Sequence, residues 1–302
     1  MTKWINSNLQ GRYREMLAGY LFVLPVLLVI ALLIFYPMAN VIITSFTDRR
    51  LGVAEVNFIG FQNYVDILNN PTFLRSFGNS LFWTIASLTF QFLLGLFCAL
   101  LLNLNFRGRF LLRALFIVPW VTPPVVAAIM YRWLLSGLFG FANQVLMALN
   151  IISEPQGWFS DPNLVMPTLI YINTWRGVPF MMITLLAGLQ TIPGELIEAA
   201  KIDGANAFRR FFTVTLPYLR NVIGIALLIY TLWNFNNFDM IFLLTRGGPG
   251  TISFTLPIMI YSSAFLEFRY GAAAALSVLM FLFMVVFAMI YLRKMKAKEV
   301  DE

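Results

Sequence analysis

The segment GELIEAAKIDGANAFRRFFTVTLP, residues 194–217, is a polar stretch in a chain that is otherwise rich in apolar residues. Hydrophobic residue types make up 60% of the sequence and charged types 12%, and the mean hydropathy is +0.78. An ordinary soluble domain carries about 25% charged residues. The composition therefore predicts an integral membrane protein, in which this segment is a connection outside the lipid.

Apolar runs on both sides of the segment are long enough to cross a bilayer, which takes about 20 residues. They predict six transmembrane helices, at about residues 17–43, 79–102, 112–135, 165–189, 222–244 and 270–292. The first run is too long for the core of a signal peptide and no small-residue cleavage site follows it, so we count it as a true span. We expect an all-α fold and a single transmembrane domain over residues 1–302.

The distribution of Lys and Arg predicts the orientation of these helices. Of the 21 Lys and Arg residues, 14 lie in the two ends of the chain and in the second and fourth connections, against six in the other connections. Because cytoplasmic connections carry an excess of Lys and Arg, we expect both termini to be cytoplasmic. The net charge of +7 is then a topology signal and not a nucleic-acid footprint. The opening segment falls in a cytoplasmic loop, residues 190–220, between the fourth and fifth spans.

Several chemistries are excluded by residues that the sequence lacks. There is no histidine, and Cys98 is the only cysteine, so histidine-based triads, intrachain disulfides and Cys/His metal clusters cannot form. No Gly precedes a Lys, so the phosphate-binding loop of a nucleotide hydrolase is missing. We expect no catalytic residue, no metal site and no cofactor in this chain, and any ATP to be bound by another chain.

Local signals predict two short helices in the polar segment. Pro193 suits the first turn of a helix and Gly204 is a natural terminator. A second helix with a stripe of Phe residues is expected to follow, and to end where Leu216 and Pro217 turn the chain back to the membrane.

The periodicity of the first short helix leaves its role open. It exposes Ala and Gly residues and flanks them with Glu195, Glu198 and Asp203, whose carboxylates suit Arg or Lys on a docking protein. Equally, the helix is compatible with an amphipathic loop that rests on its own bundle.

The same segment resembles the EAA loop of permease subunits in bacterial ABC importers, which reads Glu-Ala-Ala, three residues, Gly, and a distal Leu-Pro. The matching residues are Glu198, Ala199, Ala200, Gly204, Val214, Leu216 and Pro217. The wider chain resembles the first permease of the maltose and glycerol-phosphate type of carbohydrate importer. This likeness includes LFVLPVLLVIALLIFYP (21–37), INTWRGVPF (172–180) and LLTRGGPG (243–250).

The resemblance implies a multi-pass permease of the bacterial inner membrane. Its partners would be a second permease in a heterodimer, a dimer of cytoplasmic ATPase subunits that binds ATP and Mg²⁺, an extracytoplasmic substrate-binding protein, and membrane lipid. The residues implied in coupling to the ATPase are Glu198, Ala199, Ala200, Asp203, Gly204, Leu216 and Pro217. The loop would act as a mechanical link and not as an active site.

Polar residues at membrane depth indicate where a substrate passes. Arg176 lies 11 residues after Val165, roughly 16 Å into the fourth span at 1.5 Å per residue. In NFNNFD (234–239), amides alternate with aromatic rings, a combination suited to the hydroxyls and the C–H faces of sugars. The alternative is that these amides only join neighbouring helices by hydrogen bonds.

The resemblance places pocket positions on Asn173, Arg176 and Gly177 of the fourth span and on Tyr230, Trp233 and Asn237 of the fifth. The last three are spaced i, i+3 and i+7, which puts them on one helix face. Arg176 replaces the aliphatic residue of the maltose permease. It is interpreted either as a structural pair with Asp239 or a backbone carbonyl, which we prefer, or as a site for an anionic group on the substrate.

Two further points stay open in the sequence. Pro119, Pro123 and Pro124 should break or kink the third span, either as a mobile gate or for packing alone. The leading function is import of a sugar or glycoside. The alternatives are import of an anionic sugar derivative, such as a phosphate or sulfonate, and ion-coupled secondary transport, for which Asp239 is the one candidate carboxylate at depth.

Overall fold

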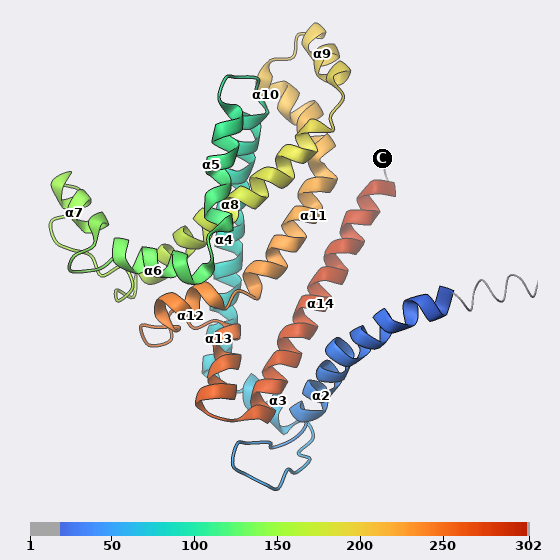
Figure 1. Ribbon diagram of the computed structural model, residues 1–302, viewed down its shortest axis with the longest axis vertical. Coiled ribbons are helices and arrows are strands. Elements are labelled where there is room, and N and C mark those ends of the chain that lie inside the picture. Colours follow the sequence, from blue (N-terminus) through green and yellow to red (C-terminus); the bar gives the residue numbers. More distant parts are fainter. Residues whose placement is uncertain (1–18, 301–302) are drawn as a thin grey trace, which may run out of the picture. The chain divides into compact units, whose positions relative to one another are not determined.

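The computed structural model describes residues 19–300, and these residues form helices and loops (Figure 1). Extended pairing in this part of the chain is limited to one isolated antiparallel bridge between Thr47 and Phe58. Five helical stretches are long and apolar enough to cross a membrane: Gly19–Ser45, Pro71–Asn103, Val165–Gln190, Ala207–Thr245 and Tyr270–Lys296. A bent pair of helices makes six if it counts as one span. The predicted all-helical membrane fold is confirmed at this level.

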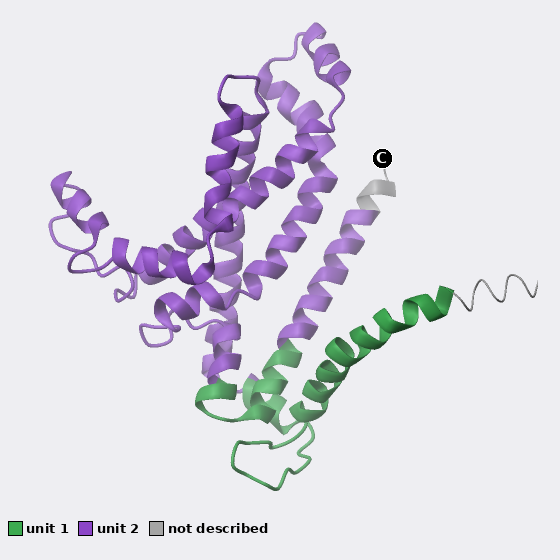
Figure 2. Ribbon diagram, viewed as in Figure 1, with its two compact units in different colours: residues 1–67, 263–279 green, residues 68–262, 280–302 purple. Residues whose placement is uncertain are grey.

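The described residues divide into two compact units (Figure 2). The first unit comprises residues 19–67 and 263–279, and the second comprises residues 68–262 and 280–300. The last helix, α14 (Tyr270–Val300), contributes to both.

The first unit contains the span Gly19–Ser45, whose C-terminal part is α2 (Tyr36–Ser45), and most of the short helix α3 (Gln62–Leu68). The buried Asn63 fixes the chain after α2, because its Nδ2 donates to the carbonyls of Ser45 (2.9 Å) and Thr47 (2.8 Å). Most side chains of the span are exposed, as expected of a helix that faces lipid.

The second unit is built on two long helices, α4 (Pro71–Asn103) and α8 (Val165–Gln190), which form its most extensive helix pair. Small residues allow the close approach. A Cβ added at Gly95 would lie 2.7 Å from Cγ of Met181. Around this pair lie α5 (Arg109–Val121), α6 (Pro124–Leu134), α11 (Leu216–Phe235), α12 (Asp239–Thr245) and α13 (Leu256–Tyr261). Helix α7 (Phe141–Ala148) packs on α6.

The predicted break in the third span is present. Helices α5 and α6 meet at an angle of 94°, and Thr122 and Pro123 between them are extended. Pro119 lies inside α5, whereas Pro124 opens α6, where its missing N–H costs nothing. The 94° bend is therefore located at Pro123 and Pro124.

The predicted turn at Leu216 and Pro217 is wrong. The chain stays helical from α10 (Ala207–Arg210) through a π-helical turn, η2 (Phe211–Thr215), into α11. In η2 the N–H of Leu216 donates to the carbonyl of Phe211, five residues back. The wider π turn relieves the clash that Pro217 would cause in a regular α-helix. The first span shows the same arrangement, with η1 (Ala31–Phe35) before Pro37.

The fifth span also differs from its prediction as one regular helix over residues 222–244. Helix α11 ends at Phe235, and residues 236–238 form a break before α12. Asn237 therefore does not lie on the same regular helix face as Tyr230 and Trp233. The amide and aromatic cluster that was assigned to a continuous helix lies at a bend.

Two apolar clusters fill the second unit, one at each end of the α4–α8 pair. One is centred on Trp83, Leu169 and Ile172, and the other on Leu102, Met181 and Leu185. Between them along both helices lies a polar layer that contains Gln91 and Asn173. This layer is the wall of the candidate site.

Candidate functional site

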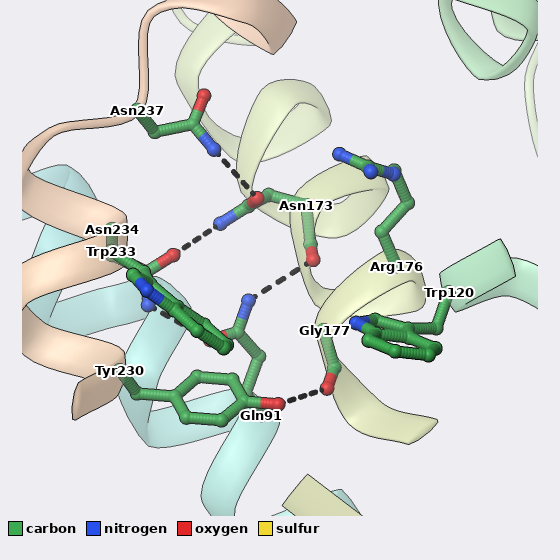
Figure 3. Close-up of a pocket in the computed structure, with 9 residues that line it drawn as sticks. All are labelled: Gln91, Trp120, Asn173, Arg176, Gly177, Tyr230, Trp233, Asn234 and Asn237. Carbon is green, nitrogen blue, oxygen red and sulfur yellow. Dashed lines mark hydrogen bonds between the residues drawn. The ribbon is translucent and has the colours of Figure 1, made fainter. Parts of the chain in front are cut away.

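A cavity opens beside the polar layer, with about 470 Å³ of empty space, part of which is open at its mouth. Helices α4, α5, α8 and α11 line it, together with the break after α11. The lining residues are Gln91, Trp120, Asn173, Arg176, Gly177, Tyr230, Trp233, Asn234 and Asn237 (Figure 3). All six residues that the sequence predicts for substrate contact line this cavity, and their role in binding stays a prediction.

Amide side chains from α4, α8 and α11 form a closed hydrogen-bond network on the cavity wall (Figure 3). Asn173 Nδ2 donates to Asn234 Oδ1 at 2.7 Å, and Asn234 Nδ2 donates to Gln91 Oε1 at 2.9 Å. Gln91 Nε2 returns a hydrogen bond to the backbone carbonyl of Asn173 at 3.0 Å. Because all three side chains are buried, this network fixes the relative position of the three helices.

Gly177 lets α4 and α11 approach α8 at the same level. A Cβ on Gly177 would lie 2.3 Å from Nε2 of Gln91, so a larger residue there would displace the amide. Its backbone carbonyl accepts a 2.7 Å hydrogen bond from the hydroxyl of Tyr230. Gly177 and Tyr230 therefore shape the cavity through packing as well as bordering it.

These contacts bear on the two interpretations of the amides. Asn173 and Asn234 use their side chains to join helices, which matches the interhelical interpretation. Asn237 is half-buried, and both hydrogen bonds of its side chain are long: Nδ2 donates to Oδ1 of Asn173 at 3.3 Å, and Oδ1 accepts from the backbone N–H of Met240 at 3.4 Å. Among the amides of the cavity, Asn237 therefore has the most hydrogen-bonding capacity left for a solute.

Arg176 does not make the expected structural pair with Asp239 or a backbone carbonyl. Among residues 19–296, no carboxylate oxygen lies within 4.0 Å of its guanidinium nitrogens, and no acceptor forms a hydrogen bond with it. Its Nε is buried and has no partner. Asp239 is exposed at the start of α12. In Figure 3 no dashed line reaches the guanidinium of Arg176.

Aromatic rings form the rest of the cavity wall. Trp120 and Trp233 are 46% and 52% exposed, and both pack against Phe180, with ring centroids 5.5 Å and 5.2 Å apart. Tyr230 extends the cluster, 5.7 Å from Trp233. The two exposed indoles offer flat apolar faces beside the polar groups.

Two cavity residues, Gln91 and Trp120, were not predicted from the sequence, and Asn234 was predicted only as part of the amide stretch. The signal for Gln91 was available, because it is the one amide in the middle of a largely apolar span. Trp120 carried no comparable signal. Aromatic residues are frequent in this chain, and only the bend after α5 and the packing on Phe180 place this ring at the cavity.

The predicted coupling loop forms the short helix α9 (Gly194–Ile202), with Pro193 directly before it. Gly204 has φ +77° and ends the helix in a Schellman motif. The N–H of Gly204 donates to the carbonyl of Lys201 (3.1 Å), and that of Ala205 donates to the carbonyl of Ala200 (3.0 Å). A residue with a side chain would be strained at this φ, so the stop after α9 depends on glycine.

Helix α9 lies beyond the end of α8 (Figure 1). Most of its residues are exposed. Glu198, Ala199, Asp203 and Gly204 are exposed, and a Cβ at Gly204 would meet nothing within 4 Å. Ile197 is the residue of α9 that packs against the apolar cluster at this end of the unit. Leu216 and Pro217 are not part of α9 but belong to the first turn of α11.

The described residues contain no cluster of three or more Cys, Asp or Glu side chains that could hold a metal ion. The site is instead a polar cavity in a bundle of apolar helices, joined through α8 to an exposed polar helix. That combination defines the class of protein: a multi-spanning membrane transport subunit.

The chain belongs to the family of binding-protein-dependent transport system inner membrane components, which residues 91–295 match. It is 34% identical to the trehalose/maltose transport system permease MalF of Thermococcus litoralis, over 96% of this chain and 98% of that protein. It is also 34% identical to the sulfoquinovosyl glycerol transport system permease SmoG of Agrobacterium fabrum, over 99% and 94%.

A solved structure has the same fold. One chain of a bacterial ABC transporter that imports the acidic polysaccharide alginate superposes with a TM-score of 0.84, at 22% identity, over 96% of this chain and 99% of that one. The family match and these relatives make the protein a permease subunit of an ABC importer, located in the inner membrane. It is a transport component and not an enzyme.

Proposed function

We propose that this chain is one of two permease subunits of a binding-protein-dependent importer of a sugar or glycoside. In this proposal it crosses the membrane six times, with α5 and α6 counted as one broken span and with both termini in the cytoplasm. Support for the sugar class comes from relatives named as permeases for trehalose/maltose, for sulfoquinovosyl glycerol and, in Bacillus subtilis, for arabinooligosaccharides.

The partners follow from this assignment. A second permease completes the pathway, a dimer of ATPase subunits binds ATP and Mg²⁺ on the cytoplasmic side, and an extracytoplasmic binding protein delivers the substrate. The residues proposed to contact the ATPase are those of α9 and its cap, Glu198, Ala199, Ala200, Asp203 and Gly204. Leu216 and Pro217 act at the start of α11, where movement of the loop would be passed to the spans.

The exposed helix α9 is the observation that carries the proposal. Helix α8 leads directly into α9, and the chain after α9 runs through α10 and η2 into α11. Both α8 and α11 line the cavity. A displacement of α9 by the ATPase would therefore move two helices that line the cavity. The polar layer between two apolar clusters provides the site where a hydroxyl-rich solute would be held.

Reconstitution tests the assignment. The tagged chain is co-expressed with the neighbouring reading frames, purified, and placed in proteoliposomes. We expect it to co-purify with a second permease and an ATPase, and uptake to require ATP and the binding protein. Uptake by this chain alone, without ATP, would contradict the proposal.

Cross-linking tests the contact at α9. Cys98 is the only cysteine and is buried, so Cys98→Ser gives a clean background. In it, Ala199→Cys should cross-link to the ATPase with a short bifunctional reagent. Ala54→Cys is the matched control, because Ala54 is exposed in a connection proposed to lie outside. Equal labelling at both positions would refute the docking role of α9.

A further inference from the structure

The guanidinium of Arg176 is a charge at the level of the polar layer that lacks a partner within the described residues. It lies half-buried on α8, three residues from Asn173 and next to Gly177, and its Nε is buried without a hydrogen bond. A charged group in the membrane interior is costly unless it is paired, and it usually marks a functional site.

The surroundings of Arg176 do not supply that partner. The amides of Asn173, Asn234 and Gln91 bond to one another, as described above. The backbone carbonyls of Asn173 and Gly177, on either side of Arg176 in α8, already accept side-chain hydrogen bonds from Gln91 and Tyr230. All other cavity residues are neutral, so Arg176 carries the one charge that lines the cavity. The carboxylate of Asp239, which is not among the lining residues, acts on this charge only from beyond ion-pair distance.

The geometry points to an anionic substrate. Resting on the proposed function, we propose that the transported glycoside carries an oxyanion, a carboxylate, sulfonate or phosphate, and that Arg176 binds it. The planar guanidinium presents paired N–H donors that match two oxygens of such a group. Trp120 and Trp233 then cover the C–H faces of the sugar ring, and Asn237 donates to or accepts from its hydroxyls.

The proposal also explains why Arg176 does not pair with Asp239. A pair within the protein would neutralise the charge that recognises the substrate, and displacing the carboxylate would oppose binding. With Asp239 exposed on α12 and outside ion-pair distance, the guanidinium is available when substrate arrives.

Uptake by the reconstituted importer tests this inference with a panel of probes. The probes are methyl glucoside as the neutral sugar, methyl glucuronide as the carboxylate, a 6-sulfonate of methyl glucoside, and glucose 6-phosphate. We expect uptake of at least one of the three anionic probes to exceed that of the neutral probe, and the preferred probe identifies the oxyanion.

The variants separate a binding role from a structural one. Arg176→Leu should lower uptake of the preferred anionic probe about 10- to 100-fold, the range of one charge-assisted hydrogen-bonded pair, and raise its half-saturation concentration. Arg176→Lys should recover part of the uptake. Arg75→Leu removes an exposed charge from α4 of the same unit and should leave uptake unchanged.

Three results would overturn the inference: preference for the neutral probe, equal loss of neutral and anionic uptake in Arg176→Leu, or loss of the chain from the membrane in both Arg176 variants. Receptor- and ATP-dependent uptake of only the neutral probe would reject the anion site and leave the proposed function standing. Absence of such uptake for every probe would reject both.

Discussion

The side chain of Gln91 on α4 fills the space that a Cβ on residue 177 of α8 would need, at 2.3 Å from its Nε2. The wall of the cavity is therefore set by a glycine on one helix and an amide on another. Because Gln91 also bonds to Asn173 and Asn234, a change at Gly177 spreads through the whole polar layer.

Gly177→Ala should destabilise the protein by about 1–3 kcal/mol, the usual cost of overpacking, because its methyl group displaces Gln91. Thermal unfolding of the purified complex in detergent measures the change. Gly78→Ala is the matched control, since Gly78 is also helical but has nothing within 4 Å of its Cβ position. A Gly177→Ala variant as stable as the Gly78→Ala variant would contradict the packing described here.

Asn234→Leu should destabilise the bundle by about 1 kcal/mol or more, because it leaves two buried atoms, Oε1 of Gln91 and Nδ2 of Asn173, without their hydrogen-bond partners. The double variant Gln91→Leu/Asn234→Leu should lose less than the sum of the two single variants. A double-mutant cycle on unfolding free energies gives the coupling. If the losses in unfolding free energy of the two single variants simply add in the double variant, the side chains of Gln91 and Asn234 are not coupled.

Gly204→Trp should abolish ATP-dependent uptake while the amount of chain in the membrane stays normal. The new side chain projects from the cap of α9, into space that the ATPase is proposed to occupy, and the φ of +77° adds strain. Gly108→Trp is the control, because Gly108 combines φ +92° with an equally open Cβ position. An equal loss of uptake in both variants would mean that backbone strain, and not contact with the ATPase, causes the loss.

Asp48→Ala should loosen the loop after α2. The backbone N–H and the side chain of Asn57 donate to the Asp48 carboxylate at 2.7 Å and 3.1 Å, and these hydrogen bonds lower the pKa of Asp48. A lowered folded pKa means that the stabilisation is present above the unfolded pKa and is lost as pH falls through the folded pKa.

Hydrogen–deuterium exchange of residues 48–58 at neutral pH measures that loosening. We expect faster exchange in Asp48→Ala and no change in Asp66→Ala, whose carboxylate accepts only from Gln62 one turn away in α3. Exchange that does not respond to Asp48→Ala would show that the loop is held by its other contacts.

Signals within a single stretch of sequence predicted the features that depend on that stretch alone. Apolar runs predicted the spans, and the Gly204 stop of α9 follows from a residue that alone tolerates its φ. The break between α5 and α6 was predicted because proline acts through its own missing donor. The same reasoning failed at Pro217, where the preceding residues adopt a π turn and keep the helix continuous.

What the sequence by itself determined is the class of fold and the short helix α9, because both rest on hydrophobicity or on start and stop signals within one segment. The six predicted residues that line the cavity were implied by the resemblance to carbohydrate permeases. The tertiary structure alone decided which polar groups are already bonded. Gln91, Asn173 and Asn234 come from three helices and satisfy one another, whereas Arg176 is left with its charge unpaired. A hydrogen bond between distant residues depends on packing geometry, which no local pattern encodes.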